Sequence, residues 1–299
     1  MASAAIDFTL GSRRLLSVPR ALTTWAFTLE DVLVGTLPPA PPPGPDGVRV
    51  LSAPTQQLGA ITARFPGFLA GGRQDYRRHY IAMDGSFEGY LRGFSGKTRS
   101  TLRRKARRLA EEAGGYRVTA HRTPAEIEDF LAAALPLSAR TYQARLLDAG
   151  LSDTPAARRA MLEAAEAGRM RAFLLHAGGQ PIAYLSLPVV GETLVYAHLG
   201  YDPDWARLSP GTVLQMEALE QLFAEARFRY FDFTEGEGAH KALFGTHWAE
   251  CTSLMLLEPT LANRTLLGAR GAFDAGVSGA KSLAARSGVL GRIRALLRA

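Results

Sequence analysis

A proline-glycine turn that leads into a helical pattern is the feature that most constrains how this chain folds. Pro210 and Gly211 form the turn, and the apolar residues after it recur at spacings of three and four, with acidic residues on the opposite side. This spacing predicts an amphipathic helix that begins at the turn. Ser209 is the expected N-cap, Pro210 suits the first helical turn, and Gly211 leaves the backbone amides open to an anion. We therefore expect an anion-binding helix N-terminus here.

Composition limits the class of protein. The chain has 299 residues, 47% of them hydrophobic, which is enough for one large domain or two of ordinary size. No apolar run reaches the roughly 18 residues that span a bilayer, so we expect a soluble cytoplasmic protein. The one cysteine, Cys251, excludes an internal disulfide, and its strand-like surroundings favour a buried structural thiol over a nucleophile.

The element pattern predicts an α/β (α+β) fold. We expect strands at 6–10, 24–34, 48–51 and 79–83, a helical region over 86–114 that is interrupted near 93–96, a strand at 116–119, and a helix capped at Thr123. A helix over 155–167 precedes an antiparallel meander of three strands within 171–199, and Tyr230–Phe233 is a further strand. A proline-rich loop covers 37–45, and Gly71 and Gly72 are expected in another loop.

The basic residues are concentrated in the second helical stretch. The residues from Lys97 to Arg108 carry seven positive charges and no acid, which equals the net charge of +7 for the whole chain. Leu102, Ala106, Leu109 and Ala113 form the stripe that docks this helix. The basic face is either a solvated surface or an anion-attracting rim for CoA phosphates, for tRNA or for an acidic carrier protein.

A series of short motifs resembles a known family. The motifs are Gly200-Tyr-Asp-Pro203, the Ser-Pro-Gly turn with its helix, Asp232-Phe-Thr-Glu-Gly236, and Lys241-Ala-Leu-Phe-Gly245. Their order resembles the GNAT-type acyltransferase domain of the CelD/BcsL group, a relative of the Fem-type aminoacyl transferases, over roughly residues 75–258. The resemblance implies a mixed, mostly antiparallel sheet flanked by helices, and it raises the alternative of a tandem pair of GNAT-like halves. It divides the chain into a strand-rich part at 1–96, an acyltransferase domain at 97–260 and a basic helical extension at 261–299.

The resemblance also assigns a donor site. In GNAT enzymes the turn before this helix holds the pyrophosphate of acyl-CoA, which implies that Ser209, Pro210, Gly211, Thr212 and the adjacent Arg207 bind the cofactor. This chain departs from the family pattern, because Leu208 and Val213 stand where a Gln or Arg and a second small residue are usual.

Lys241 matches the lysine that the Fem-type pattern implies as the stabiliser of the tetrahedral oxyanion, and His240 replaces the aromatic residue before it. An ordinary surface lysine is the alternative.

Asp232 lies between two phenylalanines. It either orients Lys241, accepts the proton of the amine, or forms a structural ion pair. His240 is a further candidate base.

Other polar residues are candidate substrate ligands. Tyr142 and Arg145 lie where GNAT enzymes receive the acceptor, and His198 and Glu235 are secondary base candidates. The six histidines show no ligand spacing, so we expect no metal.

We interpret the chain as an N-acyltransferase that moves an acyl group from acyl-CoA to a primary amine of a small molecule or of an envelope or polysaccharide precursor, by direct attack. Two rivals remain: an aminoacyl-tRNA-dependent transferase that uses the basic stretch, and a non-catalytic, membrane-peripheral binding module. Leu283, Leu290, Ile293 and Leu297 share a helical face with arginines around it, which either docks on the protein itself or contacts a membrane.

Overall fold

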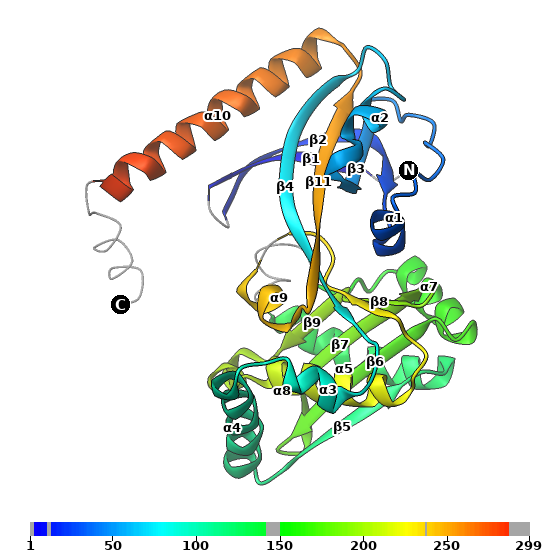
Figure 1. Cartoon of the computed structure of the whole chain (residues 1–299), viewed down its shortest axis with the longest axis vertical. Coiled ribbons are helices and arrows are strands. Elements are labelled where there is room, and N and C mark those ends of the chain that lie inside the picture. The colour runs from blue at the N-terminus through cyan, green and yellow to red at the C-terminus, as the bar shows by residue number, and fades with distance from the viewer. Residues whose placement is uncertain (1–2, 11–12, 142–149, 237, 287–299) are drawn as a thin grey trace. The chain divides into compact units, whose positions relative to one another are not determined.

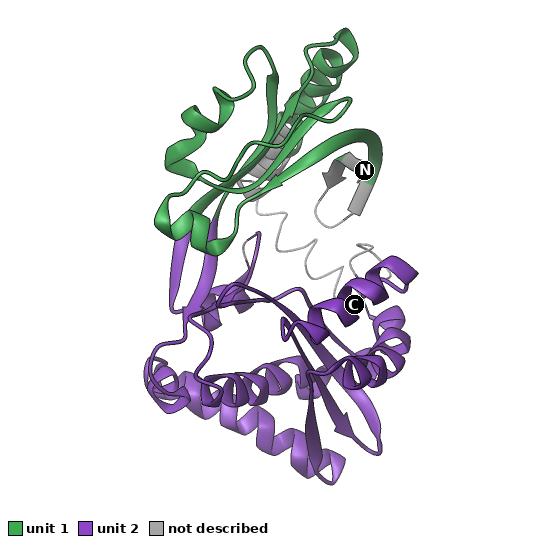
Figure 2. Ribbon diagram, turned by 90° about the vertical axis from the view of Figure 1, so that its right-hand side faces the viewer, with its two compact units in different colours: residues 1–76, 250–299 green, residues 77–249 purple. Residues whose placement is uncertain are grey.

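The chain forms two compact units, seen in a computed structural model that describes residues 3–10, 13–141, 150–236 and 238–286. Unit 1 contains Met1–Tyr76 and Glu250–Ala299, and unit 2 contains Arg77–Ala249 (Figure 2). The boundaries fall inside strands β4 (Leu69–Ala82) and β11 (His247–Leu257), and not at 96 and 260 as the sequence suggested. The reason is topological: the last strand pairs with β3 (Gly47–Pro54), which joins both ends of the chain in one unit.

Unit 2 is built on a mostly antiparallel sheet (Figure 1). Its strand order is β4-β10-β8-β7-β6-β5, with β9 paired to β7. The strands other than β4 are β5 (Tyr116–His121), β6 (Met170–Ala177), β7 (Gln180–Val190), β8 (Thr193–Val195), β9 (His198–Tyr201) and β10 (Tyr230–Asp232). Among the described strands of this unit, β8 and β10 pair in parallel, and the other pairs are antiparallel. The predicted mixed sheet flanked by helices is confirmed.

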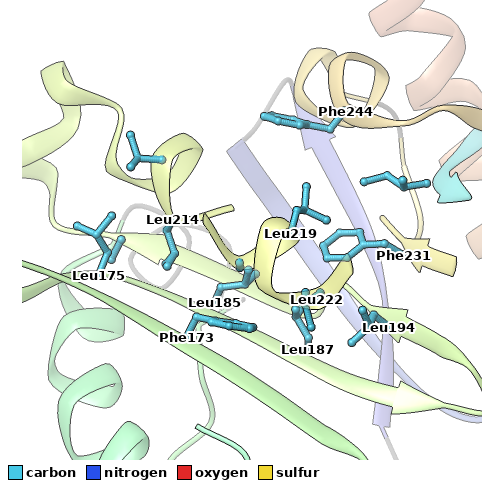
Figure 3. Packing of buried hydrophobic residues seen from close by; sticks show 14 of the residues in the cluster. Phe173, Leu175, Leu185, Leu187, Leu194, Leu214, Leu219, Leu222, Phe231 and Phe244 are labelled. Atoms are coloured by element: carbon cyan, nitrogen blue, oxygen red, sulfur yellow. The ribbon is translucent and has the colours of Figure 1, made fainter. Parts of the chain in front are cut away.

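Helices cover both faces of this sheet. They are α3 (Phe87–Arg92), α4 (Gly96–Ala113), α5 (Pro124–Arg140), α7 (Pro155–Glu166), α8 (Pro210–Ala224) and α9 (Ala239–Phe244), with a 3-10 helix at Pro203–Leu208. Figure 3 shows Leu214, Leu219 and Leu222 of α8 packed over Phe173, Leu185 and Leu187 of β6 and β7. Helices α5 and α7 pack against the alternate residues of the same strands, because side chains along a strand point to opposite faces.

Local sequence signals explain where several helices begin. Thr123 and Glu126 form the predicted capping box of α5. Ser95 caps α4, and the predicted stripe of that helix is confirmed, with Leu102 and Leu109 buried. The interruption near 93–96 separates α3 from α4.

Unit 1 is a smaller sheet with short helices. Its strand order is β1-β2-β3-β11-β4. Its remaining elements are β1 (Ser3–Leu10), β2 (Arg13–Ala26), α1 (Leu29–Val34), a 3-10 helix at Thr55–Gln57, α2 (Leu58–Thr62) and α10 (Leu261–Arg286). Buried Trp25 and Phe65 contact each other edge to face in its core.

Two predictions for unit 1 were wrong. The strand expected over 24–34 ends at Ala26, because Thr28 and Asp31 form a capping box that starts α1. Gly71 and Gly72 lie within β4 and not in a loop. Cys251 is buried in β11, as expected.

The chain's end lies partly outside the described residues. Leu290, Ile293, Leu297 and the side chain of Leu283 belong to that part, so the predicted C-terminal apolar face is not described. Among the described residues, no helix combines the length and apolar character needed to cross a membrane.

Candidate active site

The sheet of unit 2 opens next to the N-terminus of α8. Strands β8 and β10 pair in parallel as far as Val195 and Asp232, and the Tyr196 amide then donates to the Asp232 carbonyl at 2.9 Å. The following residues form β9, which pairs with β7 and lies off the path that leads to β10. Within the part of the chain that the structure describes, β9 therefore does not pair with β10, and the two segments diverge after Val195 and Asp232.

A cavity of about 490 Å³ lies at this opening, and we call it the central cavity. Tyr196, His198 and Leu199 line it from the meander, Gly211 and Thr212 from the start of α8, and His240 from α9. Tyr184 and Tyr201 complete the described lining together with Ala197. Aromatic and neutral polar groups therefore dominate the site, and its described lining contains no carboxylate.

His240 is the central titratable group of the cavity. Its Nε2 atom lies 3.3 Å from the Tyr196 hydroxyl, and its ring packs against Phe233 and Phe244. Burial lowers the pKa of His240 to about 4, and the positive charges of Lys241 and Lys105 act in the same direction. The imidazole is therefore neutral at pH 7 and has a lone pair that can accept a proton.

Tyr196 is the matching proton donor. Burial raises the pKa of its phenol above the ordinary value of 10.0, so the hydroxyl keeps its proton at neutral pH. Sequence analysis did not select Tyr196, because its neighbours Val195 and Ala197 in the chain give no sign of a polar site.

The predicted phosphate-binding turn before α8 has a different backbone conformation and different hydrogen bonds from those expected. Ser209 adopts a left-handed conformation with φ 55° and its side chain makes no capping hydrogen bond. The amides of Thr212 and Val213 both donate to the Ser209 carbonyl, and Pro210 has no N–H. The expected row of open amides is therefore wrong, and the Gly211 amide is the one in this turn that donates to no backbone carbonyl of the described residues.

Gly211 also has a packing role. A Cβ atom on Gly211 would lie 2.8 Å from the Leu199 Cδ2 atom and 3.2 Å from a Tyr201 ring atom. The glycine therefore allows α8 to approach β9 closely. This close approach, which the sequence did not indicate, places Thr212 at the central cavity.

Lys105 supplies the charge that the turn itself lacks. Leu208, at the family's usual Gln or Arg position, is buried, whereas the Lys105 Nζ atom lies 3.4 Å from the Thr212 hydroxyl. An ammonium, a hydroxyl and the Gly211 amide together fit a phosphate group. Sequence analysis counted Lys105 only as one charge of a basic helix, although its place beside the Leu102 and Ala106 stripe was a usable signal.

Three of the six other basic residues of α4 are engaged within the protein. Arg108 and Arg207 both pair with Glu112, Arg107 pairs with Glu111, and Arg99 donates to two backbone carbonyls. Arg207 is therefore held on an exposed ion pair beside the turn.

Asp232 lies in a complete ion pair. Arg78 Nε donates to Oδ1 at 3.0 Å and Nη2 donates to Oδ2 at 2.6 Å, while the Thr234 amide donates to Oδ1 at 2.9 Å. The two side chains are 7% and 1% exposed. Of the three predicted roles, this geometry matches the structural ion pair, and among the described residues no hydrogen bond joins Asp232 to Lys241.

Lys241 is not among the residues that line the central cavity. Its Nζ atom donates to the Glu235 carbonyl, and burial lowers the pKa of the amine against the opposing effect of the Glu235 and Asp232 carboxylates. His198 lines the cavity, Glu235 is exposed on the loop after β10, and Tyr142 and Arg145 lie outside the described residues.

Residues 96–242 match the family model described as an acetyltransferase (GNAT) domain. The GNAT-type resemblance is thereby confirmed, and the chain contains a domain of this type. The protein is accordingly a transferase. No curated protein matches the chain.

Solved structures with similar folds include L-PGS from Bacillus licheniformis, which is 14% identical, with a TM-score of 0.48 and coverage of 75% of this chain and 72% of that one. FemX is 12% identical, with a TM-score of 0.47 and coverage of 70% and 72%. A GCN5-related N-acetyltransferase from Kribbella flavida is 14% identical, with a TM-score of 0.36 and coverage of 72% and 70%.

Proposed function

We propose that the protein is an N-acyltransferase that transfers an acyl group from acyl-CoA to a primary amine by direct attack. The observation that carries this proposal is the central cavity, in which a neutral His240 and a protonated Tyr196 stand beside the Lys105 and Thr212 pair. The acceptor is proposed to be a small molecule or an envelope or polysaccharide precursor, as expected for the CelD/BcsL group.

The chemistry follows from the two neighbouring groups. The amine nitrogen bonds to the thioester carbon and becomes acidic as it does so, and His240 then accepts its proton. The carbon–sulfur bond breaks, and Tyr196 supplies a proton to the departing thiolate. Because His240 and Tyr196 lie 3.3 Å apart, the proton from the amine can restore the phenol. No covalent bond to the enzyme is required.

Groups outside the reacting pair bind the donor or position the backbone around the site. Lys105, Thr212 and the Gly211 amide would bind the donor's pyrophosphate. Lys241 positions the loop after β10 through the Glu235 carbonyl. Asp232, with Arg78, fixes the end of β10 from which that loop starts.

The test is a thermal-shift and turnover screen with acyl-CoA donors of increasing chain length. A donor at a hundred times its dissociation constant stabilises the folded protein by about 2.7 kcal/mol. Turnover without added RNA, unaffected by ribonuclease, is the expected result. Activity that ribonuclease abolishes and charged tRNA restores would establish the aminoacyl-tRNA donor instead, and absence of binding and turnover with both donors would leave the non-catalytic module.

A further inference from the structure

A second, smaller cavity of about 140 Å³ lies between α3, α4 and α8, and we call it the α4–α8 pocket. Its walls are largely apolar, with Leu91 from α3, Leu102 and Ala106 from α4, and Val213 and Met216 from α8. Such a volume suits one flat group of a larger ligand and not a whole ligand.

The α4–α8 pocket shares one lining residue with the central cavity. Thr212 lines both this pocket and the central cavity, and Lys105 lies against its hydroxyl. A donor whose reactive end is in the central cavity and whose phosphates reach Lys105 would therefore continue into the α4–α8 pocket.

The polar rim of the pocket has charges of both signs. Arg103 is exposed and makes no hydrogen bond or ion pair within the part of the chain that the structure describes, whereas Glu217 accepts from the Tyr116 hydroxyl at 2.6 Å. Glu220 also lines the pocket, and the exposed side of its helix leaves the carboxylate free to accept from a ligand amine.

This combination fits a purine nucleoside phosphate. Aliphatic walls pack on the faces of a base, a carboxylate accepts from its exocyclic amine, and an arginine pairs with a phosphate. A simple acyl chain matches the walls but leaves the two charged edges without a partner.

We propose that the α4–α8 pocket binds the adenosine 3′-phosphate end of the acyl-CoA donor, with Arg103 on the 3′-phosphate and Glu220 on the adenine amine. This inference rests on the proposed function. It assigns a nucleotide-binding role to α4, whose first residue, Gly96, is also the first residue of the acetyltransferase match.

The experiment measures dissociation constants by calorimetry for CoA, for 4′-phosphopantetheine, which lacks the nucleoside, and for adenosine 3′,5′-bisphosphate, which lacks the pantetheine. Ala106→Leu places extra methylenes in the pocket, and Ala110→Leu on the same helix is its matched control. Arg103→Gln removes the rim charge, and Arg104→Gln is the control at the neighbouring exposed position.

We expect Ala106→Leu to weaken binding of CoA and of the bisphosphate about tenfold, because a tight apolar pocket discriminates at the level of single methylenes. Arg103→Gln should weaken both about two- to fivefold, the range for an exposed ion pair. Phosphopantetheine binding should stay within about twofold in both variants, and the two controls should bind every ligand like the parent.

The outcomes separate this inference from the proposed function. Two results would overturn the nucleoside assignment and leave the acyl-CoA proposal in place. In the first, CoA binds no more tightly than phosphopantetheine; in the second, Ala106→Leu weakens the binding of CoA and of phosphopantetheine equally. Bisphosphate binding at the pocket without CoA binding supports a nucleotide site but overturns the CoA donor, and a CCA-ended RNA that competes for it would assign the pocket to tRNA. A protein that binds none of the three ligands overturns both proposals.

Discussion

Asp232 and His240 occupy neighbouring elements of unit 2, and their surroundings differ in a way that separates framework from chemistry. Both oxygens of Asp232 accept hydrogen bonds from Arg78, one also accepts from an amide, and the side chain is 1% exposed, so the carboxylate is paired and shielded from a reacting group. His240 has one hydroxyl neighbour and faces a cavity. A buried ionisable group with a full set of partners holds the fold together, whereas one with an unused valence beside open space can act on a ligand.

The largest effect, on the free energy of unfolding, should come from removing the ion-pair partner of Asp232. Arg78→Met leaves the Asp232 carboxylate buried and unpaired, which costs about 3–5 kcal/mol of unfolding free energy. Urea unfolding measures the loss, and Arg77→Met, at the adjacent exposed position of β4, is the control. The fraction that remains folded should keep its turnover within about tenfold, since Arg78 does not line the central cavity. A stable variant that is inactive would move the Arg78 and Asp232 pair into the chemistry.

His240→Ala should lower turnover by about 10²- to 10⁴-fold, the usual contribution of a positioned acid or base. Because the Lys105 and Thr212 pair is untouched, acyl-CoA affinity should change little, which a thermal-shift titration checks. His247→Ala, on an exposed histidine of β11, is the matched control. Turnover within threefold of the parent would remove His240 as the base.

Lys241→Met tests how the role of Lys241 differs from that of its neighbour His240 on α9. If the lysine positions the Glu235 carbonyl, turnover should fall by about tenfold, less than for His240→Ala. A loss of about 10²- to 10³-fold would instead show the oxyanion-stabilising role that the family resemblance implied. Single-turnover kinetics measure this difference directly.

The smallest effect is on the pH dependence of stability. The pKa of His240 is lowered from 6.5 to about 4 by folding, so between these values the unfolded chain binds a proton that the folded protein does not. Stability from this group is therefore full above the unfolded pKa and decreases as pH falls from 6.5 to about 4. Because the ring is partly open to the cavity, we expect about 1 kcal/mol or less.

His240→Gln should flatten that part of the pH profile, which thermal unfolding between neutral and acidic pH measures. An unchanged slope in the variant would show that His240 titrates normally.

Local pattern was sufficient for much of unit 2. The capping box at Thr123, the stripe of Leu102 and Leu109, the meander and the start of α8 at Pro210 depend on residues a few positions apart, and all were predicted, whereas the open amides expected at that turn were not found. The sequence also predicted the GNAT-type order of those elements. The wrong strand prediction over 24–34 in unit 1 also had a local cause. The capping box of Thr28 and Asp31 starts a helix within an aromatic, β-branched run that is typical of a strand.

Only the tertiary structure decided which residues form the site. Arg78 reaches Asp232 across 154 positions because β4 and β10 pair with Tyr80 opposite Asp232, which brings the residue two positions away to the same face. Lys105 reaches Thr212 across 107 positions because α4 packs beside α8, and Tyr196 meets His240 just after the parallel pairing of β8 with β10 ends. Periodicity in a sequence specifies which face of an element is buried, but strand register and helix docking determine which distant polar groups meet there.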